Sequence, residues 1–228
     1  MRIVIDLQGA QAENRLRGIG KYSLSIAKAI AKNNRNHEIY IVLNGLFYDS
    51  IEPIRKAFND LLPCKNICIF STPDNVAAIN GIRERRIASE YIRESFIASL
   101  DPDIVLVTSL FEGLVDDAVT SVKSFASSFP TAVILYDLIP YIFQSQYLNN
   151  PDVKRWYLDK IEHFSKADLL LSISDASRND GLNHLSFSKE KIINISSAVD
   201  EVFAPQFIDQ KHAKDILNTY NLKKKIVM

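Results

Sequence analysis

Long hydrophobic runs, a cysteine framework and an excess of one charge are all absent from this sequence. No apolar stretch approaches the length of a membrane span, and the first residues form a strand pattern rather than a signal peptide. The 27 basic residues are matched by 27 acidic ones, so the basic excess typical of nucleic-acid-binding proteins is missing. Cys64 and Cys68, with four scattered histidines, make no disulfide framework and a poor zinc set. We therefore expect a cytoplasmic protein with no nucleic-acid partner.

Short apolar runs alternate with helical patterns along most of the 228 residues. A chain of this length can bury a sizeable core, and alternation of strands with helices is typical of a parallel sheet wrapped by helices. The sequence therefore predicts an α/β fold, a Rossmann-like parallel sheet with helices on both faces. The strands that we expect cover residues 2–6, 38–43, 66–70, 104–107, 131–136, 168–172 and 191–195.

The predicted helices carry start signals and apolar faces. Asn150 can cap a helix whose first position is Pro151 and which ends near residue 166. Ser174 or Asp175 can cap another helix that ends between residues 183 and 185. A helix opening at Gly18 should turn one apolar stripe toward the sheet, made of Ile19, Tyr22, Ile26, Ala27 and Ile30.

The predicted helix over residues 82–100 is both basic and amphipathic. Its apolar side holds Ile87, Tyr91, Ile92 and Phe96, with Arg83, Arg85, Arg86 and Arg93 largely elsewhere. Such a helix can lie on an anionic membrane, which would place the protein at the inner face of the membrane. The interleaved Glu84, Glu90 and Glu94 offset those charges, so a helix docked on the sheet is the favoured interpretation.

The character of the chain changes after Phe203-Ala204-Pro205. A short polar helix over 211–220 leads to the tail Leu222-Lys223-Lys224-Lys225-Ile226-Val227-Met228, which looks like the start of another strand. We expect residues 1–205 to form one domain, and residues 206–228 to be a linker helix and the start of a truncated second domain. A frayed natural end is the alternative.

Two glycines mark the entrance to the first helix, in Arg17-Gly18-Ile19-Gly20. Glycines let the backbone approach a ligand closely, and the free N–H groups and positive dipole end of a helix attract anions such as phosphate. The spacing fits neither a dinucleotide fingerprint, which needs a third glycine where Ser23 stands, nor a Walker loop, which needs a hydroxyl residue at Tyr22. The alternative is that the glycines only allow a tight turn.

Polar side chains follow the predicted strands where ligands bind in open parallel sheets, beyond the carboxyl ends. They include Asp6, Gln8, Thr108, Ser109, Glu112, Tyr136, Asp137, Ser174, Asp175, Ser177 and Arg178. Carboxylates, hydroxyls and an arginine suit a substrate with many hydroxyl groups and an anionic leaving group. Each residue also has a structural alternative: Asp6 can brace the loop, Asp137 can form a turn, and Ser174 can cap a helix. Tyr136, Tyr141, Phe143 and Tyr147 form either a wall for sugar rings or part of the core.

Taken in order, these segments resemble the N-terminal half of the family 4 retaining glycosyltransferases, which have the two-domain GT-B fold. The resemblance spans the whole chain and is strongest to bacterial mannosyltransferases that build O-antigen polysaccharide. It is carried by residues 1–6, Arg17-Gly18-Ile19-Gly20-Lys21-Tyr22, Thr108-Ser109-Leu110-Phe111-Glu112-Gly113, Tyr136-Asp137-Leu138-Ile139-Pro140, residues 172–178, and Ala198-Val199-Asp200 with Phe203.

The resemblance implies a metal-independent enzyme that uses a nucleotide sugar, with GDP-mannose as the expected donor, and no cofactor. Its acceptor would be a growing glycan or a lipid-linked one. Arg17, Gly18, Ile19 and Gly20 would approach the donor diphosphate, and Asp137 would be the catalytic residue. The sugar and acceptor would lie near Glu112, Tyr136, Ser174 and Arg178. Many relatives have His-Asp where this chain has Tyr136-Asp137, so a histidine contact to the sugar is not expected here.

The second domain of such enzymes binds the nucleotide and supplies a pair of glutamates, an arginine and a lysine. None of these lies in this chain, so we expect the chain alone to be inactive. A non-catalytic carbohydrate-binding or partner-binding module of the same fold is the alternative function.

Overall fold

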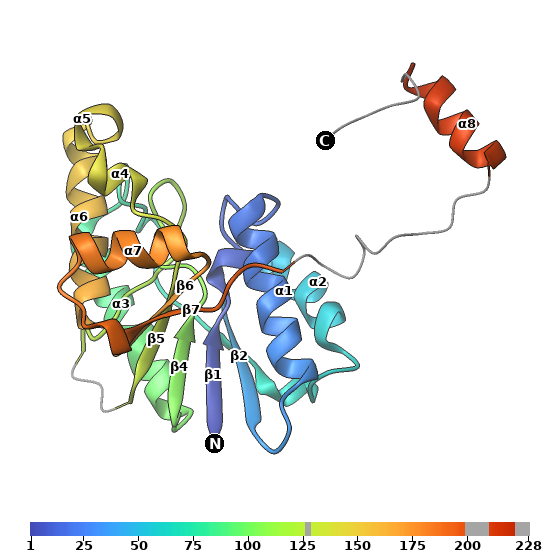
Figure 1. Cartoon of the computed structure of the whole chain (residues 1–228). Coiled ribbons are helices and arrows are strands. Elements are labelled where there is room, and N and C mark those ends of the chain that lie inside the picture. Colours follow the sequence, from blue (N-terminus) through green and yellow to red (C-terminus); the bar gives the residue numbers. More distant parts are fainter. Residues whose placement is uncertain (126–128, 199–209, 222–228) are drawn as a thin grey trace. The chain divides into compact units, whose positions relative to one another are not determined.

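The structure is a computed structural model that describes residues 1–125, 129–198 and 210–221. It divides into two compact units, Met1–Ser197 and Ala198–Met228. The first unit is built on a sheet of seven parallel strands in the order β3-β2-β1-β4-β5-β6-β7 (Figure 1). The strands are β1 (Arg2–Asp6), β2 (Glu38–Asn44), β3 (Ile67–Phe70), β4 (Ile104–Val107), β5 (Thr131–Leu135), β6 (Leu169–Ser172) and β7 (Ile192–Asn194). This confirms the predicted α/β fold and every predicted strand, with bounds that agree within one residue.

The order of the strands reverses between β1 and β4. From β1 the chain moves outward through β2 to β3, then crosses back to β4, which pairs with the other side of β1. In open parallel sheets the connections leave in opposite directions at such a point, and ligands bind beyond the carboxyl ends of the strands there. The fold therefore marks the carboxyl ends of β1 and β4 as the place for a site.

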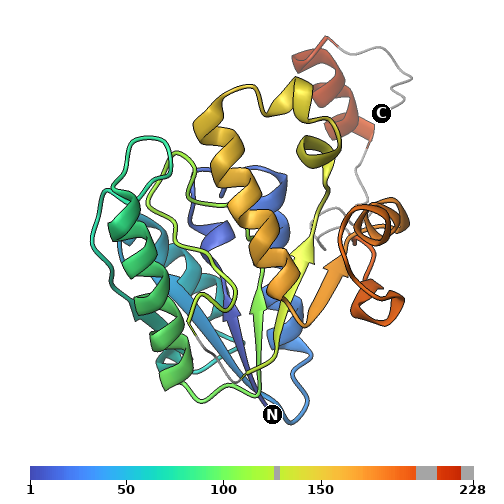
Figure 2. The ribbon, with the colours of Figure 1, turned by 90° about the vertical axis from the view of Figure 1, so that its left-hand side faces the viewer.

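Helices cover both faces of the sheet (Figures 1 and 2). One hydrophobic core unites strand residues with α1 and α2, and a second unites the opposite faces of the strands with α3, α6 and α7. The helices are α1 (Gly18–Lys32), α2 (Tyr48–Phe58), α3 (Arg83–Ser99), α4 (Ile139–Ile142), α5 (Gln144–Tyr147), α6 (Pro151–Lys166) and α7 (Asp175–His184). Single 3₁₀ turns, η1 (Gln8–Ala10), η2 (Cys64–Asn66) and η3 (Lys189–Lys191), complete the first unit.

Helix α1 faces the sheet with small residues. Its fully buried positions are Gly20, Ser23, Ala27 and Ala31, so only Ala27 of the predicted stripe lies at the centre of the contact. The bulky Tyr22, Ile26 and Ile30 are partly buried and flank that line. The predicted stripe was displaced from the centre of the contact because it was drawn through the large apolar residues. Close packing of a helix on a sheet instead places small side chains at the centre of the contact.

Helix α3 docks on the sheet, as the favoured interpretation predicted, and Ile87 and Phe96 of the predicted apolar side are partly buried, but its buried face is mostly polar. Ser89, Arg93, Glu94 and Ile97 are its buried residues, whereas Tyr91 and Ile92 are exposed. Arg93 is only 1% exposed, because its Nε donates to Asp6 Oδ2 at 2.6 Å. Arg93, which was expected largely away from the apolar side, thus belongs to the buried face, because the buried Asp6 carboxylate pairs with its guanidinium.

The segment between β4 and β5 explains why α3 has a polar inner face. Residues 108–125 and 129–130 of this segment form no helix, so their amides need partners from elsewhere. Glu94 accepts from Ser121 Oγ at 2.6 Å, from the Ser124 amide at 3.0 Å and from the Phe125 amide at 2.7 Å. From α6, Lys160 Nζ donates to Thr120 Oγ1 at 2.8 Å. Charged side chains of α3 and α6 thus satisfy polar groups of this segment, which a crossover helix would satisfy by its own backbone hydrogen bonds.

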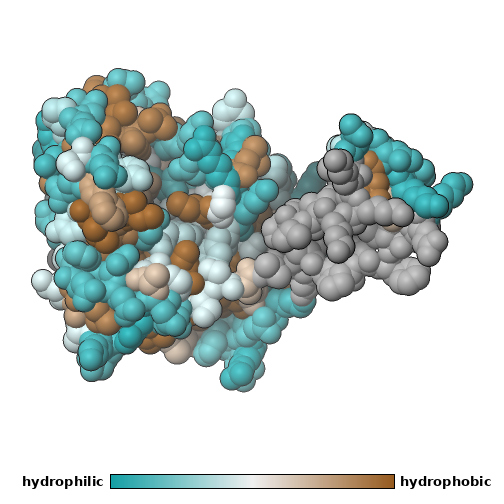
Figure 3. Space-filling view, turned by 45° about the horizontal axis from the view of Figure 1, so that its top comes forward, coloured by the Kyte–Doolittle hydropathy of each residue, from teal (hydrophilic) through white to brown (hydrophobic). Residues whose placement is uncertain are grey.

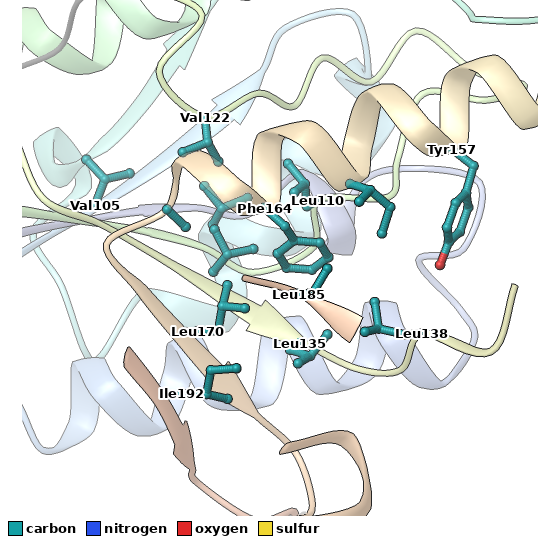
Figure 4. Close-up of a cluster of buried hydrophobic side chains, with 14 of the residues drawn as sticks. Val105, Leu110, Val122, Leu135, Leu138, Tyr157, Phe164, Leu170, Leu185 and Ile192 are labelled. Carbon is teal, nitrogen blue, oxygen red and sulfur yellow. The ribbon is translucent and has the colours of Figure 1, made fainter. Parts of the chain in front are cut away.

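Apolar residues of the same segment complete the second core (Figure 4). Val122 and Leu110 lie beside Phe164 of α6, above the strand residues Leu135 and Leu170. All five are buried, at 1% exposure or less. The segment after β4 is therefore held from both sides, by apolar packing and by buried charges.

The second unit contains α8 (Gln210–Thr219), one residue from the predicted range. Three predictions lie outside the described residues: the boundary at 205, the Val199, Asp200 and Phe203 part of the resemblance, and the start of a strand in the tail 222–228. No helix in the described ranges is both long and apolar enough to cross a bilayer.

Candidate functional site

The amino-terminal end of α1 lies at the carboxyl edge of the sheet, at the switch point. Its N-cap residue is Arg17, and no side chain caps the helix. The first turn carries no acidic residue. A Cβ placed on Gly18 would meet nothing within 4 Å, so the space beside this residue is open. The first-turn amides and the positive end of the helix dipole are thus available to an anion.

The two glycines of the motif have different roles. A Cβ on Gly20 would lie 2.4 Å from Arg15 Cα and 2.5 Å from Arg15 O, so this glycine allows the loop to cross the helix. Gly20 is buried, whereas Arg17 and Gly18 are exposed and Ile19 is partly buried. The tight-turn interpretation therefore explains Gly20, and it does not explain Gly18. We refer below to residues 12–20 as the glycine loop.

Asp137 follows β5 and is exposed at the same edge. Its Oδ1 accepts from the amide of Ile139 at 3.0 Å, which forms the turn that starts α4. Burial, followed by the charge of Asp137, raises the pKa of the Tyr157 hydroxyl on α6. Asp137 thus has the structural role that its turn position suggested and also presents a carboxylate to solvent. Its catalytic role stays a prediction.

The hydroxyl of Tyr136 serves the fold. It donates to the Thr108 carbonyl at 3.0 Å and lies 3.3 Å from Ser23 Oγ. The ring packs edge-on against Tyr22, with centroids 5.6 Å apart, and burial raises the pKa of the Tyr136 hydroxyl. Tyr136 thus ties α1 to the ends of β4 and β5, and its predicted contact with a sugar stays a prediction.

Glu112 is buried at 3% exposure and does not face open solvent. Ser109 Oγ donates to its Oε1 at 2.7 Å, and Asn14 of the glycine loop lies close enough to lower the pKa of the Glu112 carboxyl. Burial raises the pKa of Glu112 to about 7, against the lowering effect of the Ser109 bond. The predicted contact of Glu112 with sugar or acceptor remains untested, but its observed partners are parts of the loop.

Ser174 and Arg178 make contacts within the domain. Ser174 Oγ accepts from the Ser177 amide at 3.1 Å and so caps α7. Arg178 donates from Nε to the Ile192 carbonyl at 2.9 Å and from Nη2 to the Lys189 carbonyl at 3.3 Å. The structure therefore gives Ser174 its alternative role as a cap and uses Arg178 to hold the start of β7. Their binding roles stay predictions.

Asp6 and Gln8, at the end of β1, belong to an internal network. Arg93 forms an ion pair with Asp6, and the Gln8 amide donates to Asp6 Oδ1 at 3.1 Å. Gln8 also pairs with Val119, donating to its carbonyl at 2.6 Å and accepting from its amide at 2.9 Å. The interpretation of Asp6 as a brace is thus correct.

Two carboxylates that sequence reasoning missed hold the loops of this edge. Asp116 Oδ2 accepts from the amide of Glu13 in the glycine loop at 2.6 Å. Asp117 accepts from three amides, those of residues 75, 76 and 77, at 3.1, 2.7 and 3.2 Å. No periodicity or motif marks these residues, because their partners are backbone amides far away in the sequence.

Apolar side chains gather beside Asp137. Figure 3 shows them at its upper left, where α4 and α5 lie. Ile139, Phe143 and Tyr147 are exposed, whereas Tyr136 and Tyr141 are partly buried. The proposed aromatic wall is therefore split, with two of its four members open to solvent. In the described ranges no three His, Cys, Asp or Glu side chains are grouped to hold a metal ion.

Comparison with known proteins finds both similar sequences and similar solved structures. The chain aligns over its whole length with the serotype-specific mannosyltransferase WbdA of Escherichia coli, at 31% identity over 231 residues. The chain is thus similar to one part of the WbdA mannosyltransferases. Two further E. coli WbdA sequences match 89% of the chain at 29% identity. The chain spans about a quarter of these relatives, 27% of the first and 25% of the others.

Solved structures confirm the fold. A glycosyltransferase from Rickettsia africae matches 99% of the chain and 50% of its own length, with TM-score 0.52 and 13% identity. MnaA from S. aureus, solved with UDP, matches 97% of the chain and 50% of its own, with TM-score 0.51 and 15% identity. A UDP-N-acetylglucosamine 2-epimerase matches 85% and 47%, with TM-score 0.56 and 13% identity. No protein-family model matches the chain. The predicted Rossmann-like half of a GT-B fold and the resemblance to mannosyltransferases are confirmed.

Proposed function

We propose that this chain is the acceptor-side domain of a metal-independent retaining glycosyltransferase. The enzyme transfers mannose from GDP-mannose to a growing polysaccharide of the O-antigen type, on the cytoplasmic side of the membrane. The similarity to WbdA mannosyltransferases over the whole chain supports the reaction class and the sugar. The nucleotide is bound by a second domain that this chain does not include.

The uncapped start of α1 is the observation that carries the proposal. It combines an open approach at Gly18 with the lack of a capping side chain and of an acid in the first turn. It also lies at the switch point, where open parallel sheets bind their ligands. A diphosphate placed there would accept hydrogen bonds from amides that are already oriented.

Departure of a nucleoside diphosphate leaves a cation-like sugar and concentrates negative charge on the leaving group. Oriented amides stabilise such a charge without reorganising, and loss of one donor of this kind typically costs about 3 kcal/mol, roughly 100-fold in rate. The positive end of the α1 dipole acts in the same direction. Asp137, exposed after β5, orients the acceptor hydroxyl or the transferred sugar.

Substitution of Gly18 by valine tests the role of the loop. A Cβ at this position meets nothing within 4 Å, and the branched side chain would occupy the path by which a phosphate reaches the amides. We expect transfer in the protein that carries this chain to fall roughly 100-fold, with the thermal unfolding midpoint nearly unchanged. Ala29→Val, on the exposed side of α1, is the matched control for a β-branched residue in this helix. Unchanged turnover in Gly18→Val would remove the loop from the mechanism.

A further inference from the structure

We propose that Asp116 and Glu112 are positioning residues that brace the glycine loop, so that the start of α1 faces the donor in one orientation. This inference rests on the proposed function for its consequence in catalysis. Its structural part, the brace itself, stands on contacts within the domain. Neither carboxylate needs to touch the substrate.

Asp116 joins the glycine loop to the segment after β4. Its Oδ2 accepts from the Glu13 amide at 2.6 Å, and its Oδ1 accepts from the Ala118 amide at 3.1 Å. Hydrogen bonds from amides to an ionised carboxylate are about twice as strong as neutral ones. The Asp116 side chain therefore ties the glycine loop to the segment after β4, which we call the base of the brace.

Glu112, which precedes Asp116 in the segment after β4, links this segment to the glycine loop as well. Ser109 Oγ donates to it at 2.7 Å, and Asn14 of the glycine loop lies close enough to lower the pKa of the Glu112 carboxyl. Ser109 directly follows Thr108 at the end of β4, and Thr108 Oγ1 donates to the Asp6 carbonyl at 2.8 Å. The brace is thus continuous from the strands of the switch point to the residue next to Glu13.

The base that carries both carboxylates is itself fixed at several points. Asp117 accepts from three amides of residues 75–77, Val119 pairs with Gln8, and Thr120 accepts from the buried Lys160. These hydrogen bonds hold the segment after β4 in place even when the glycine loop moves. The brace can therefore restrain the glycine loop, which has few buried residues of its own.

Charges around Glu112 make this brace sensitive to pH. Burial, with the charge of Asp116 in the same segment, raises the pKa of Glu112 to about 7 against the lowering effects of Ser109, Asn14 and Lys160 of α6. Above this value the carboxylate is ionised and attracts the Asn14 side chain more strongly. Below it the neutral acid is a weaker acceptor, so the loop is held less firmly.

Amide hydrogen exchange of the 228-residue chain tests the brace without any activity. We expect Asp116→Ala to raise exchange in the glycine loop about 10-fold, while α7 changes less than about 2-fold. Val115→Ala, at an exposed position of the same segment, is the matched control. Glu112→Gln should differ from the parent chain at about pH 8 and match it at about pH 6, because glutamine imitates the neutral acid. Equal exchange in Asp116→Ala and Val115→Ala would overturn the proposal.

Donor kinetics in the protein that carries this chain test the consequence. We expect Asp116→Ala to raise the KM for GDP-mannose about 10-fold and to change kcat by less than about 3-fold, with partial rescue by Asp116→Asn. The donor KM of the parent should rise as the pH falls through about 7, and that of Glu112→Gln should stay flat. A parent protein that transfers no mannose would refute the proposed function and leave the brace to the exchange result. Normal kinetics in a variant with a loosened loop would refute the positioning role.

Discussion

The helices α1 and α7 begin at the same edge of the sheet, but the free amides of their first turns are treated differently. Ser174 caps α7, and Asp175 places a negative charge in its first turn. The start of α1 has neither feature, and its N-cap residue is the cation Arg17. Capping groups satisfy the free amides of a helix and acids complement its dipole. The domain therefore completes α7 internally and leaves α1 incomplete.

This difference indicates that the start of α7 serves the fold, whereas the start of α1 is kept for a ligand. An uncapped start costs stability, and α1 compensates by close packing of Gly20, Ser23, Ala27 and Ala31 on the sheet. The brace from Asp116 keeps the entrance in place without occupying the amides of the first turn. Changes that make the two helices more alike test this conclusion.

The largest effect is expected from Gly20→Ala. The added Cβ would lie 2.4 Å from Arg15 Cα and 2.5 Å from its carbonyl oxygen, so the loop and the first turn cannot both keep their positions. Overpacking of this kind costs about 1–3 kcal/mol. We expect a loss of this size in urea unfolding of the chain and the loss of measurable transfer in the protein that carries it.

Gly181→Ala in α7 is the matched control for this change. There the added Cβ would lie 2.9 Å from Ile192 Cδ1 and from Leu135 Cδ2, which are the ends of flexible side chains. We expect a smaller loss of stability than in Gly20→Ala. If the two substitutions cost the same, the crossing of loop and helix at Gly20 is not the constraint that we describe.

A second, smaller effect is expected when α1 receives the cap that α7 has. Arg17→Ser supplies a hydroxyl that accepts from the amides of the first turn, which stabilises a helix by about 1 kcal/mol. The same bond competes with a phosphate for those amides. Arg17→Ala removes the cation without adding a cap, so the difference between the two variants isolates the cap. We expect Arg17→Ser to unfold at higher urea concentration than Arg17→Ala and to have a donor KM several-fold higher.

A higher stability without a change in donor KM would mean that the first-turn amides of α1 do not meet the donor. That result would leave the fold assignment intact. It would also separate the contribution of the Arg17 charge, which both variants lack, from that of the amides.

The sheet could be predicted from the sequence because its signals are local. Parallel strands buried on both faces are short apolar runs, and Asn150-Pro151 and Ser174 mark the helix starts. Helix α2 was not predicted, since it has no capping side chain and contains Pro53. The buried face of α3 was predicted only in part, because most of its buried residues are polar. Its polar residues gain partners only when the segment after β4 folds against them.

The candidate site was predictable in position and less so in detail. Strand order places Gly18, Glu112, Tyr136, Asp137 and Ser174 near one edge, and the structure puts them there. Whether a side chain faces a ligand or a neighbouring backbone depends on distances that periodicity does not contain. Asp116 shows the limit, because its partner is the Glu13 amide, 103 positions away in the sequence.

The smallest effect is expected when the cap of α7 is removed. Ser174→Ala deletes the oxygen that accepts from the Ser177 amide and should cost about 1 kcal/mol in urea unfolding. Ser174→Asp retains an acceptor and should restore most of that loss, because a carboxylate also complements the helix dipole. If the anion were bound at α7, the loss of this cap would free amides for the phosphate and lower the donor KM. A fall in the donor KM of Ser174→Ala would therefore reverse the roles of the two helices, whereas an unchanged donor KM supports the role of α1.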